Sequence, residues 1–338
     1  MTRSFCIDNF RALAILLIVL SHCTGFLYDN KLNNINMLDS FISNIFAGAT
    51  FFFVFITGYL TPKVFYPRYT FRDFFSKKII QLIPPYLCMS LPMILMWVLR
   101  DKGFFAGYDH WLQPILYILT GMSFFAYWYI PFAILLFLAY PILRKVDSYT
   151  NLMSVLIVVL SVISIFVQRP IDSFNAFQSL IYYIPVYLMG SFVLKKQDIF
   201  SSNLAITISF ILFTFLVVTQ TTFKNHIGNY HSNMMDFNGI DYMYLQKMCL
   251  TIFIFGLFSR YLNKEYSVLS IFARNSFGIF FMHMPVLYGV LFFNKWVQVE
   301  PNLMSYLFIS LFITVMSLLL LKFTKLVFKK NSRYIVGV

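Results

Sequence analysis

The feature that most constrains this chain is a series of long apolar blocks separated by short charged breaks. A helix of about 20 apolar residues spans the ~30 Å hydrocarbon core of a bilayer, because each residue rises about 1.5 Å. Of the 338 residues, 59% are hydrophobic and 12% are charged, which is too apolar for a water-soluble domain of this size. The blocks are continuously apolar, so the sequence predicts an all-α, polytopic membrane protein with one transmembrane domain over residues 1–338.

Ten transmembrane spans are predicted from these blocks. They cover residues 12–28, 41–61, 79–99, 125–143, 151–168, 176–194, 203–221, 242–259, 267–293 and 303–321. A shorter apolar segment, residues 110–121, is expected to be an interfacial or re-entrant piece on the outer side. An even number of spans places both termini on the same side of the membrane.

The basic residues indicate which side that is. The chain has 26 Lys and Arg against 13 Asp and Glu, an excess that in a soluble protein would point to nucleic acid but here follows the predicted loops. With both termini inside, 18 of the 26 fall in inner segments, two lie within spans, and six lie outside: Lys31, Arg100, Lys102, Arg169, Lys224 and Lys295. The positive-inside rule therefore predicts an N-in, C-in protein without a nucleic-acid partner.

Metal and cofactor signatures are weak. The four cysteines show no CxxC spacing and are interpreted as core residues. The polar outer segment 221–242 holds two histidines and two aspartates, but their spacing is not that of zinc ligands, so we expect a solvated loop or a lip that contacts an acceptor. Neither a Walker loop nor a dinucleotide fingerprint occurs, and we expect neither a metal nor a bound cofactor.

Arg11 and His22 lie in the first apolar block. Eleven helical residues turn through about 1100°, within ~20° of three full turns, so the two side chains share one face. The same spacing places His22 about 16 Å deeper than Arg11, near the middle of the bilayer. An ionisable group there is costly and is by default functional, and a neutral imidazole can accept a proton from a hydroxyl. A histidine that only packs between helices is the alternative.

Five motifs in order resemble those of the acyltransferase-3 family of bacterial membrane O-acyltransferases. The segment IDNFRALAILLIVLSH carries the arginine, ten residues and histidine of the family's first helix, here Arg11 and His22. The later segments that resemble family motifs are FFFVFITGYL (51–60), KKIIQLIPPYL (77–87), YWYIP (127–131) and NSFGIFFMHMP (275–285). The family commonly has two arginines three apart before its third helix, whereas Lys78 and Gln81 stand here. This pair therefore supplies one positive charge instead of two.

The resemblance implies transfer of an acyl group, usually acetyl, from cytoplasmic acyl-coenzyme A to a hydroxyl of a cell-envelope polysaccharide or lipid-linked glycan. It also implies a multi-pass protein of the bacterial plasma membrane, with acetyl-CoA as co-substrate. We expect His22 to be the general base or the site of a covalent acetyl-imidazole, with Arg11 binding the donor. The basic residues between the second and third spans offer contacts to the phosphates of coenzyme A, although topology alone also explains them. These residues are Lys63, Arg68, Arg72, Lys77 and Lys78.

Other candidates and alternatives stay open. His283 is expected to position the acceptor or to join a buried polar network, and Arg274, nine residues earlier, lies half a helical turn away. Trp128 and Tyr129 are expected near the outer interface, where they stack on carbohydrate or belong to the aromatic belt. Lys247 is expected to snorkel outward, with contact to the substrate as the alternative. The competing functions are a glycan or lipid transporter and a succinyl-type acyltransferase, for which Arg274 would bind the extra carboxylate.

Overall fold

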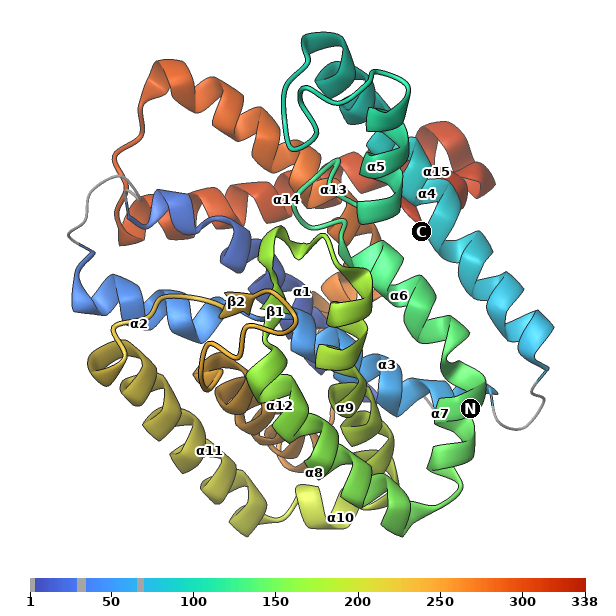
Figure 1. Cartoon of the computed structure of the whole chain (residues 1–338), viewed down its shortest axis with the longest axis vertical. Coiled ribbons are helices and arrows are strands. Elements are labelled where there is room, and N and C mark those ends of the chain that lie inside the picture. The colour runs from blue at the N-terminus through green and yellow to red at the C-terminus, as the bar shows by residue number, and fades with distance from the viewer. Residues whose placement is uncertain (1–3, 29–34, 66–69) are drawn as a thin grey trace.

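The computed structural model describes residues 4–28, 35–65 and 70–338, which form a bundle of long helices (Figure 1). Nine helices within these ranges are long and apolar enough to cross a bilayer. A tenth span results when α6 and α7, which are bent by 58° relative to each other, are counted together. The all-α, polytopic membrane architecture is therefore confirmed. The N-in, C-in orientation stays a prediction.

Helices follow one another along the described part of the chain with short connections between them. The first half contains α1 (Phe5–His22), η1 (Thr24–Phe26), α2 (Met37–Phe46), α3 (Thr50–Phe65), α4 (Phe71–Arg100), α5 (Leu112–Thr120), α6 (Tyr129–Leu138), α7 (Tyr140–Asp147) and α8 (Thr150–Val167). The second half contains η3 (Ile171–Ser173), α9 (Ala176–Lys195), α10 (Gln197–Phe200), α11 (Asn203–Val218), η4 (Thr219–Phe223), α12 (Tyr242–Arg260), α13 (Ser267–Val297), α14 (Leu303–Phe328), η5 (Lys329–Asn331) and α15 (Ser332–Val336). Two short strands, β1 (Arg169–Pro170) and β2 (His231–Ser232), pair in parallel.

Three predicted boundaries, both ends of the first span and the start of the third, are wrong in an instructive way. Helix α1 begins at Phe5, well before the predicted start at residue 12, and ends at His22. The predicted basic loop 62–78 is mostly helical, because α4 begins at Phe71. The side chain of Thr70 accepts a hydrogen bond from the backbone N–H of the third residue after it and so caps α4. Hydropathy marks only the apolar part of a helix, whereas capping decides where the helix begins.

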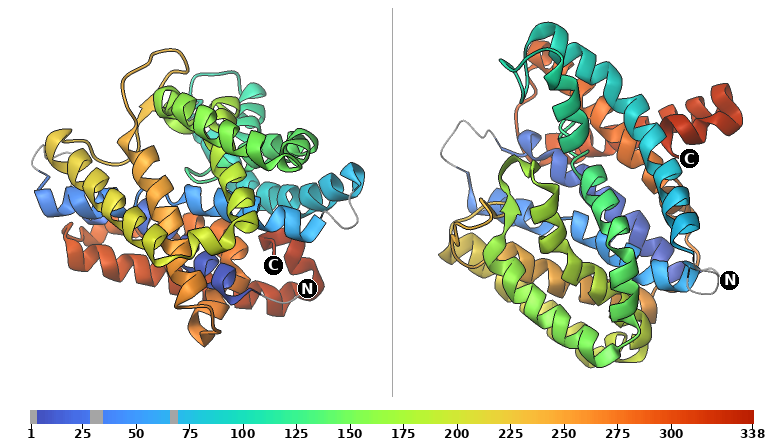
Figure 2. Two further views of the ribbon diagram at one scale, coloured as in Figure 1. Left: turned by 90° about the horizontal axis from the view of Figure 1, so that it is seen from below. Right: turned by 45° about the vertical axis from the view of Figure 1, so that its right-hand side comes forward.

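Helix α1 lies at the centre of the bundle and packs against α3, α12, α13 and α14 (Figures 1 and 2). Beside it, α3 and α9 approach so closely that their backbones touch. A Cβ atom at Gly58 would lie 1.9 Å from the carbonyl oxygen of Tyr187, and one at Gly190 would lie 2.2 Å from that of Phe55. Small residues at a helix crossing permit such close packing in membranes. This pair of glycines therefore fixes the position of α3.

The second predicted span, residues 41–61, is broken inside the bundle. Helix α2 ends at Phe46 and α3 begins at Thr50, with Gly48 between them at φ 72°. The Nζ of Lys247 donates to the carbonyls of Asn44 (3.1 Å) and Ile45 (2.6 Å) at the end of α2. Lys247 is fully buried, so the expectation that it snorkels outward is wrong. Irregular backbone at membrane depth occurs where it is buried in protein or lines a cavity.

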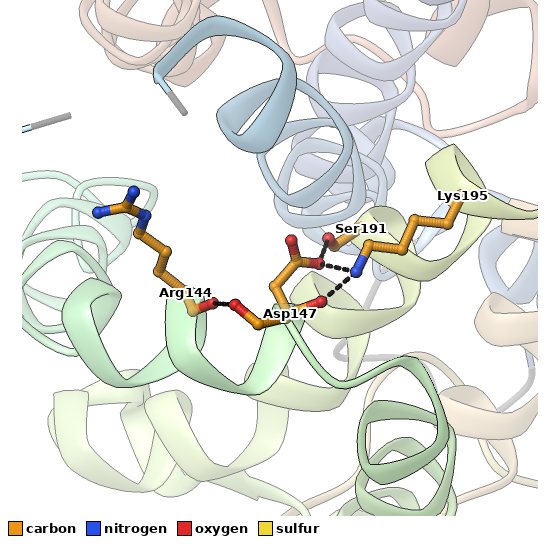
Figure 3. Close-up of polar contacts among 5 residues, drawn as sticks. Arg144, Asp147, Ser191 and Lys195 are labelled. Atoms are coloured by element: carbon orange, nitrogen blue, oxygen red, sulfur yellow. Dashed lines mark hydrogen bonds and ion pairs between the residues drawn. The ribbon is translucent and has the colours of Figure 1, made fainter. Parts of the chain in front are cut away.

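A buried polar cluster fixes α7 against α9 (Figure 3). The carboxylate of Asp147 lies 3.2 Å from the Nζ of Lys195 and accepts a hydrogen bond from the hydroxyl of Ser191. The same ammonium donates to the backbone carbonyl of Asp147. The last turn of α7 is thereby held to α9 after the bend that separates α6 from α7.

Candidate active site

A cavity of about 710 Å³ lies among α1, α3, α4, α6 and α13, which is a usual size for a ligand site. Its Arg11 end is defined by polar residues near the starts of α1 and α4: Arg11, Lys78 and Gln81. Its Arg169 end is defined by polar residues of the segments that precede α9 and α12: Arg169, Asn229 and His231. Ser21 and His22 also line it. Three breaks in the helical backbone lie at or beside this space: residue 23 after α1, residues 47–49 between α2 and α3, and residues 121–128 between α5 and α6.

The predicted pair on the first helix faces one space. Arg11 and His22 both line the cavity, as their shared helical face requires. Arg11 lies 3.8 Å from the carboxylate of Asp8, and its side chain is 30% exposed. His22 is the last residue of α1 and lies close enough to Arg169 for the two to interact electrostatically. The helix therefore separates a cation at one end of the cavity from an imidazole toward the other.

His283 lies against His22. Their ring centroids are 5.5 Å apart, and Nδ1 of His283 lies 3.1 Å from the carbonyl oxygen of Ile279. Because a carbonyl only accepts, Nδ1 carries the proton and Nε2 is left as an acceptor. That Nε2 is buried and has no hydrogen-bond partner in the described part of the chain. His283 is fully buried and is not among the described residues that line the cavity, so it contacts the lining residue His22 from outside the lining itself.

The basic residues expected to bind the donor do not all line the cavity. Lys78 lines the cavity, with its Nζ 5.4 Å from the ring centroid of Phe65 and 5.2 Å from that of Phe137. Gln81 lines it one turn further along α4. Arg72 and Lys77 are exposed and are not among the described lining residues.

Two further basic residues need separate mention. Arg68 lies outside the described residues. Arg274 lines the cavity, but its side chain is 66% exposed and lies 3.4 Å from Glu265. Arg274 therefore lies at the exposed margin of the cavity, beside a surface carboxylate.

The aromatic entry to α6 is more buried than predicted. Trp128 is 6% exposed and stacks on Tyr183 with a centroid separation of 6.0 Å, so it is not an exposed belt residue. Tyr129, half-buried, also lines the cavity. The preceding Tyr127 donates its hydroxyl proton to the carbonyl of Phe281 at 2.6 Å, which ties this segment to α13. Trp128 and Tyr129 are therefore presented to the cavity and not to lipid.

Sequence reasoning missed the residues of the Arg169 end. The guanidinium carbon of Arg169 lies 4.9 Å from the ring centroid of Trp128, and pairing of β1 with β2 places Arg169 opposite His231. The available signal was charge: Arg169 is one of only six basic residues in the predicted outer segments. The segment expected to form a lip over an acceptor contributes Asn229 and His231 to the lining.

Comparison with known proteins gives one match. The acyltransferase-3 family model, described as an acyltransferase domain, matches residues 5–322, nearly the whole chain. No curated protein and no solved structure matches.

Proposed function

Because the chain belongs to the acyltransferase-3 family and is a membrane acyltransferase, we propose that it transfers an acetyl group from cytoplasmic acyl-coenzyme A to a hydroxyl of a cell-envelope polysaccharide or lipid-linked glycan. The proposed location is the bacterial plasma membrane. Family membership favours this enzyme over the glycan or lipid transporter that the sequence left open.

The observation that carries the proposal is that Arg11 and His22 line the same cavity. In the predicted N-in orientation, Arg11 and Lys78 are at its cytoplasmic end, where acyl-coenzyme A is available. Their cations then bind the phosphates of the donor, and the thioester extends along α1 toward His22, about 16 Å further on. The acceptor enters from the Arg169 end. The imidazole therefore lies where the two substrates meet.

The chemistry follows from the two histidines. His22 accepts the proton of the acceptor hydroxyl as its oxygen attacks the thioester carbonyl carbon, a role worth about 10²–10⁴ in rate. The carbon–sulfur bond then breaks, and coenzyme A leaves as a thiolate that takes the proton from His22. His283 is a positioning residue: its Nε2 acceptor is available to the second nitrogen of His22, in the manner of a base held by a third group. A covalent acetyl-imidazole is the rival route.

The test uses purified protein in proteoliposomes with radiolabelled acetyl-coenzyme A and an envelope glycan fraction. We expect His22→Ala to reduce label transfer by about 10²-fold or more, while the exposed His110→Gln serves as a control that leaves transfer unchanged. Both variants must give the same thermal midpoint as the wild type. A folded His22→Ala protein that labels glycan at the wild-type rate would exclude the base role. Ping-pong kinetics would favour the covalent route.

The donor end is tested by a matched pair of lysines. Lys78→Gln removes a cation from the cavity lining, whereas Lys322→Gln removes an exposed one from α14. We expect Lys78→Gln to raise KM for acetyl-coenzyme A about tenfold, as loss of a charged contact does, with no change for Lys322→Gln. Equal KM values for the two variants would contradict donor binding at the Arg11 end.

A further inference from the structure

The Arg169 end of the cavity contains a buried cation that has no ion-pair partner among the described residues. Arg169 is 8% exposed, and its Nε is buried with no hydrogen-bond partner. The described residues provide no ion pair to its guanidinium. Burying a charge without a partner is costly, and an arginine that lines a cavity in this state is equipped to take an anionic ligand.

One carboxyl group acts on Arg169 from nearby, but it is already committed. Asp241 is fully buried and accepts hydrogen bonds from the hydroxyl of Tyr182 (2.8 Å) and the backbone N–H of Tyr244 (2.7 Å). It interacts with Arg169 electrostatically without approaching to ion-pair distance. Asp241 therefore stabilises the local fold and leaves the donors of the guanidinium available to the cavity.

The surroundings of Arg169 hold it in place. Its guanidinium lies over the indole of Trp128 at 4.9 Å, and its backbone N–H donates to the carbonyl of Tyr230 at 3.2 Å. Such stacking orients the planar fork of the guanidinium. The stacking holds the face of the guanidinium, and the backbone hydrogen bond holds the residue that carries it. The N–H groups of the guanidinium therefore point in a defined direction, as recognition of a carboxylate or phosphate requires.

Two neighbouring features suit an anion that is attached to a sugar. Nδ1 of His231 lies 2.8 Å from the carbonyl oxygen of Pro170, so Nδ1 carries the proton and Nε2 can accept a hydrogen bond from a sugar hydroxyl. Residues 47–50, which include the start of α3, line the same end. The positive end of a helix dipole favours an anion there.

We propose that Arg169 binds an oxyanion group of the acceptor, a sugar carboxylate or a glycosyl phosphate, and so determines which acceptor hydroxyl reaches His22. This inference rests on the proposed function, since it identifies the class of acceptor. Arg11 and Arg169 then divide the anions between them: donor phosphates bind at one end of the cavity, and the acceptor's charge binds at the other.

The test measures binding without catalysis. Thermal midpoints of the purified full-length protein are recorded with D-glucuronate, α-D-glucose 1-phosphate and neutral D-glucose. We expect at least one anionic sugar to stabilise the wild type more than glucose does, and the one that does so identifies carboxylate or phosphate as the natural group. Arg169→Gln should weaken this binding about 10–100-fold, Arg169→Lys less, and the outer-loop control Lys224→Gln not at all.

Several outcomes would overturn the assignment. One is equal stabilisation by the anionic sugars and by glucose, and another is unchanged anion binding in a folded Arg169→Gln protein. Loss of the stabilisation in Arg11→Gln with retention in Arg169→Gln would move the anion to the donor end. A fall in turnover of succinyl-coenzyme A but not acetyl-coenzyme A in Arg169→Gln, with sugar binding intact, would assign Arg169 to the acyl chain. Acetyl-coenzyme A turnover without anion binding refutes only this inference, whereas anion binding without any turnover refutes only the proposed function.

Discussion

Replacement of Gly58 by alanine should displace one wall of the cavity. The added Cβ would lie 1.9 Å from the carbonyl oxygen of Tyr187, and real Cβ contacts essentially never fall below 3.0 Å. Helix α3 must therefore move away from α9 by about 1 Å, because a helix backbone cannot yield locally. Overpacking of this kind costs about 1–3 kcal/mol. Since α3 carries Thr57 and other lining residues, a shift of about 1 Å should lower the rate of acyl transfer by up to 10²-fold.

The matched control is Gly289→Ala in α13, because a Cβ at Gly289 has no heavy atom within 4 Å. The two variants carry the same chemical change within a helix and differ only in the space available. Thermal midpoints in detergent and acetyl transfer in proteoliposomes would be measured for both. We expect Gly289→Ala to match the wild type in both assays. A Gly58→Ala protein with wild-type stability and rate would show that α3 and α9 are not held in backbone contact, and the reasoning from packing would be refuted.

Three further predictions concern buried polar groups. Lys247→Met should lower the thermal midpoint, because two carbonyls at the end of α2 lose their donor at about 1–3 kcal/mol each; an unchanged midpoint would mean that water replaces the ammonium. Asp147→Asn should weaken the contact of α7 with α9 by removing the charge opposite Lys195, which faster proteolysis within α7 would report. Burial raises the pKa of Asp241 to about 7, above its unfolded value of about 4, so its stabilising contribution is complete below pH ~4 and is lost as pH rises through 7. Asp241→Asn should therefore reduce the fall in thermal midpoint between pH 5 and pH 8, whereas the exposed Asp236→Asn should not.

The site shows where sequence reasoning succeeds. Arg11 and His22 belong to one helix, so their shared face follows from 3.6 residues per turn, and the structure places both in one cavity. The helical periodicity also separates Arg274 from His283. Lys78 and Gln81, which stand where the resembling family commonly has two arginines, both line the cavity. In each case the inference concerned neighbours on one helix.

The same reasoning failed where partners come from distant segments. The ammonium of Lys247 donates to carbonyls about two hundred positions away in the sequence. Hydropathy does not reveal such partners, and it predicted that the side chain would extend to the membrane surface. His283 was expected either to position the acceptor or to join a buried polar network, and helical periodicity gave no sign that its ring packs against that of His22 on a distant helix. Arg169 and His231 meet only because two short strands pair across the loops that precede α9 and α12.

The number and length of the apolar blocks already establish a bundle of membrane-spanning helices, because no other arrangement of such blocks satisfies the backbone in lipid. The sequence also shows which residues share a face of each helix. The three-dimensional packing was needed to show which faces meet, where α2 ends and α3 begins, and which buried cations have partners. The physical reason is that helical periodicity is a local property, whereas packing, cavities and the pairing of charges depend on contacts between segments far apart in the chain.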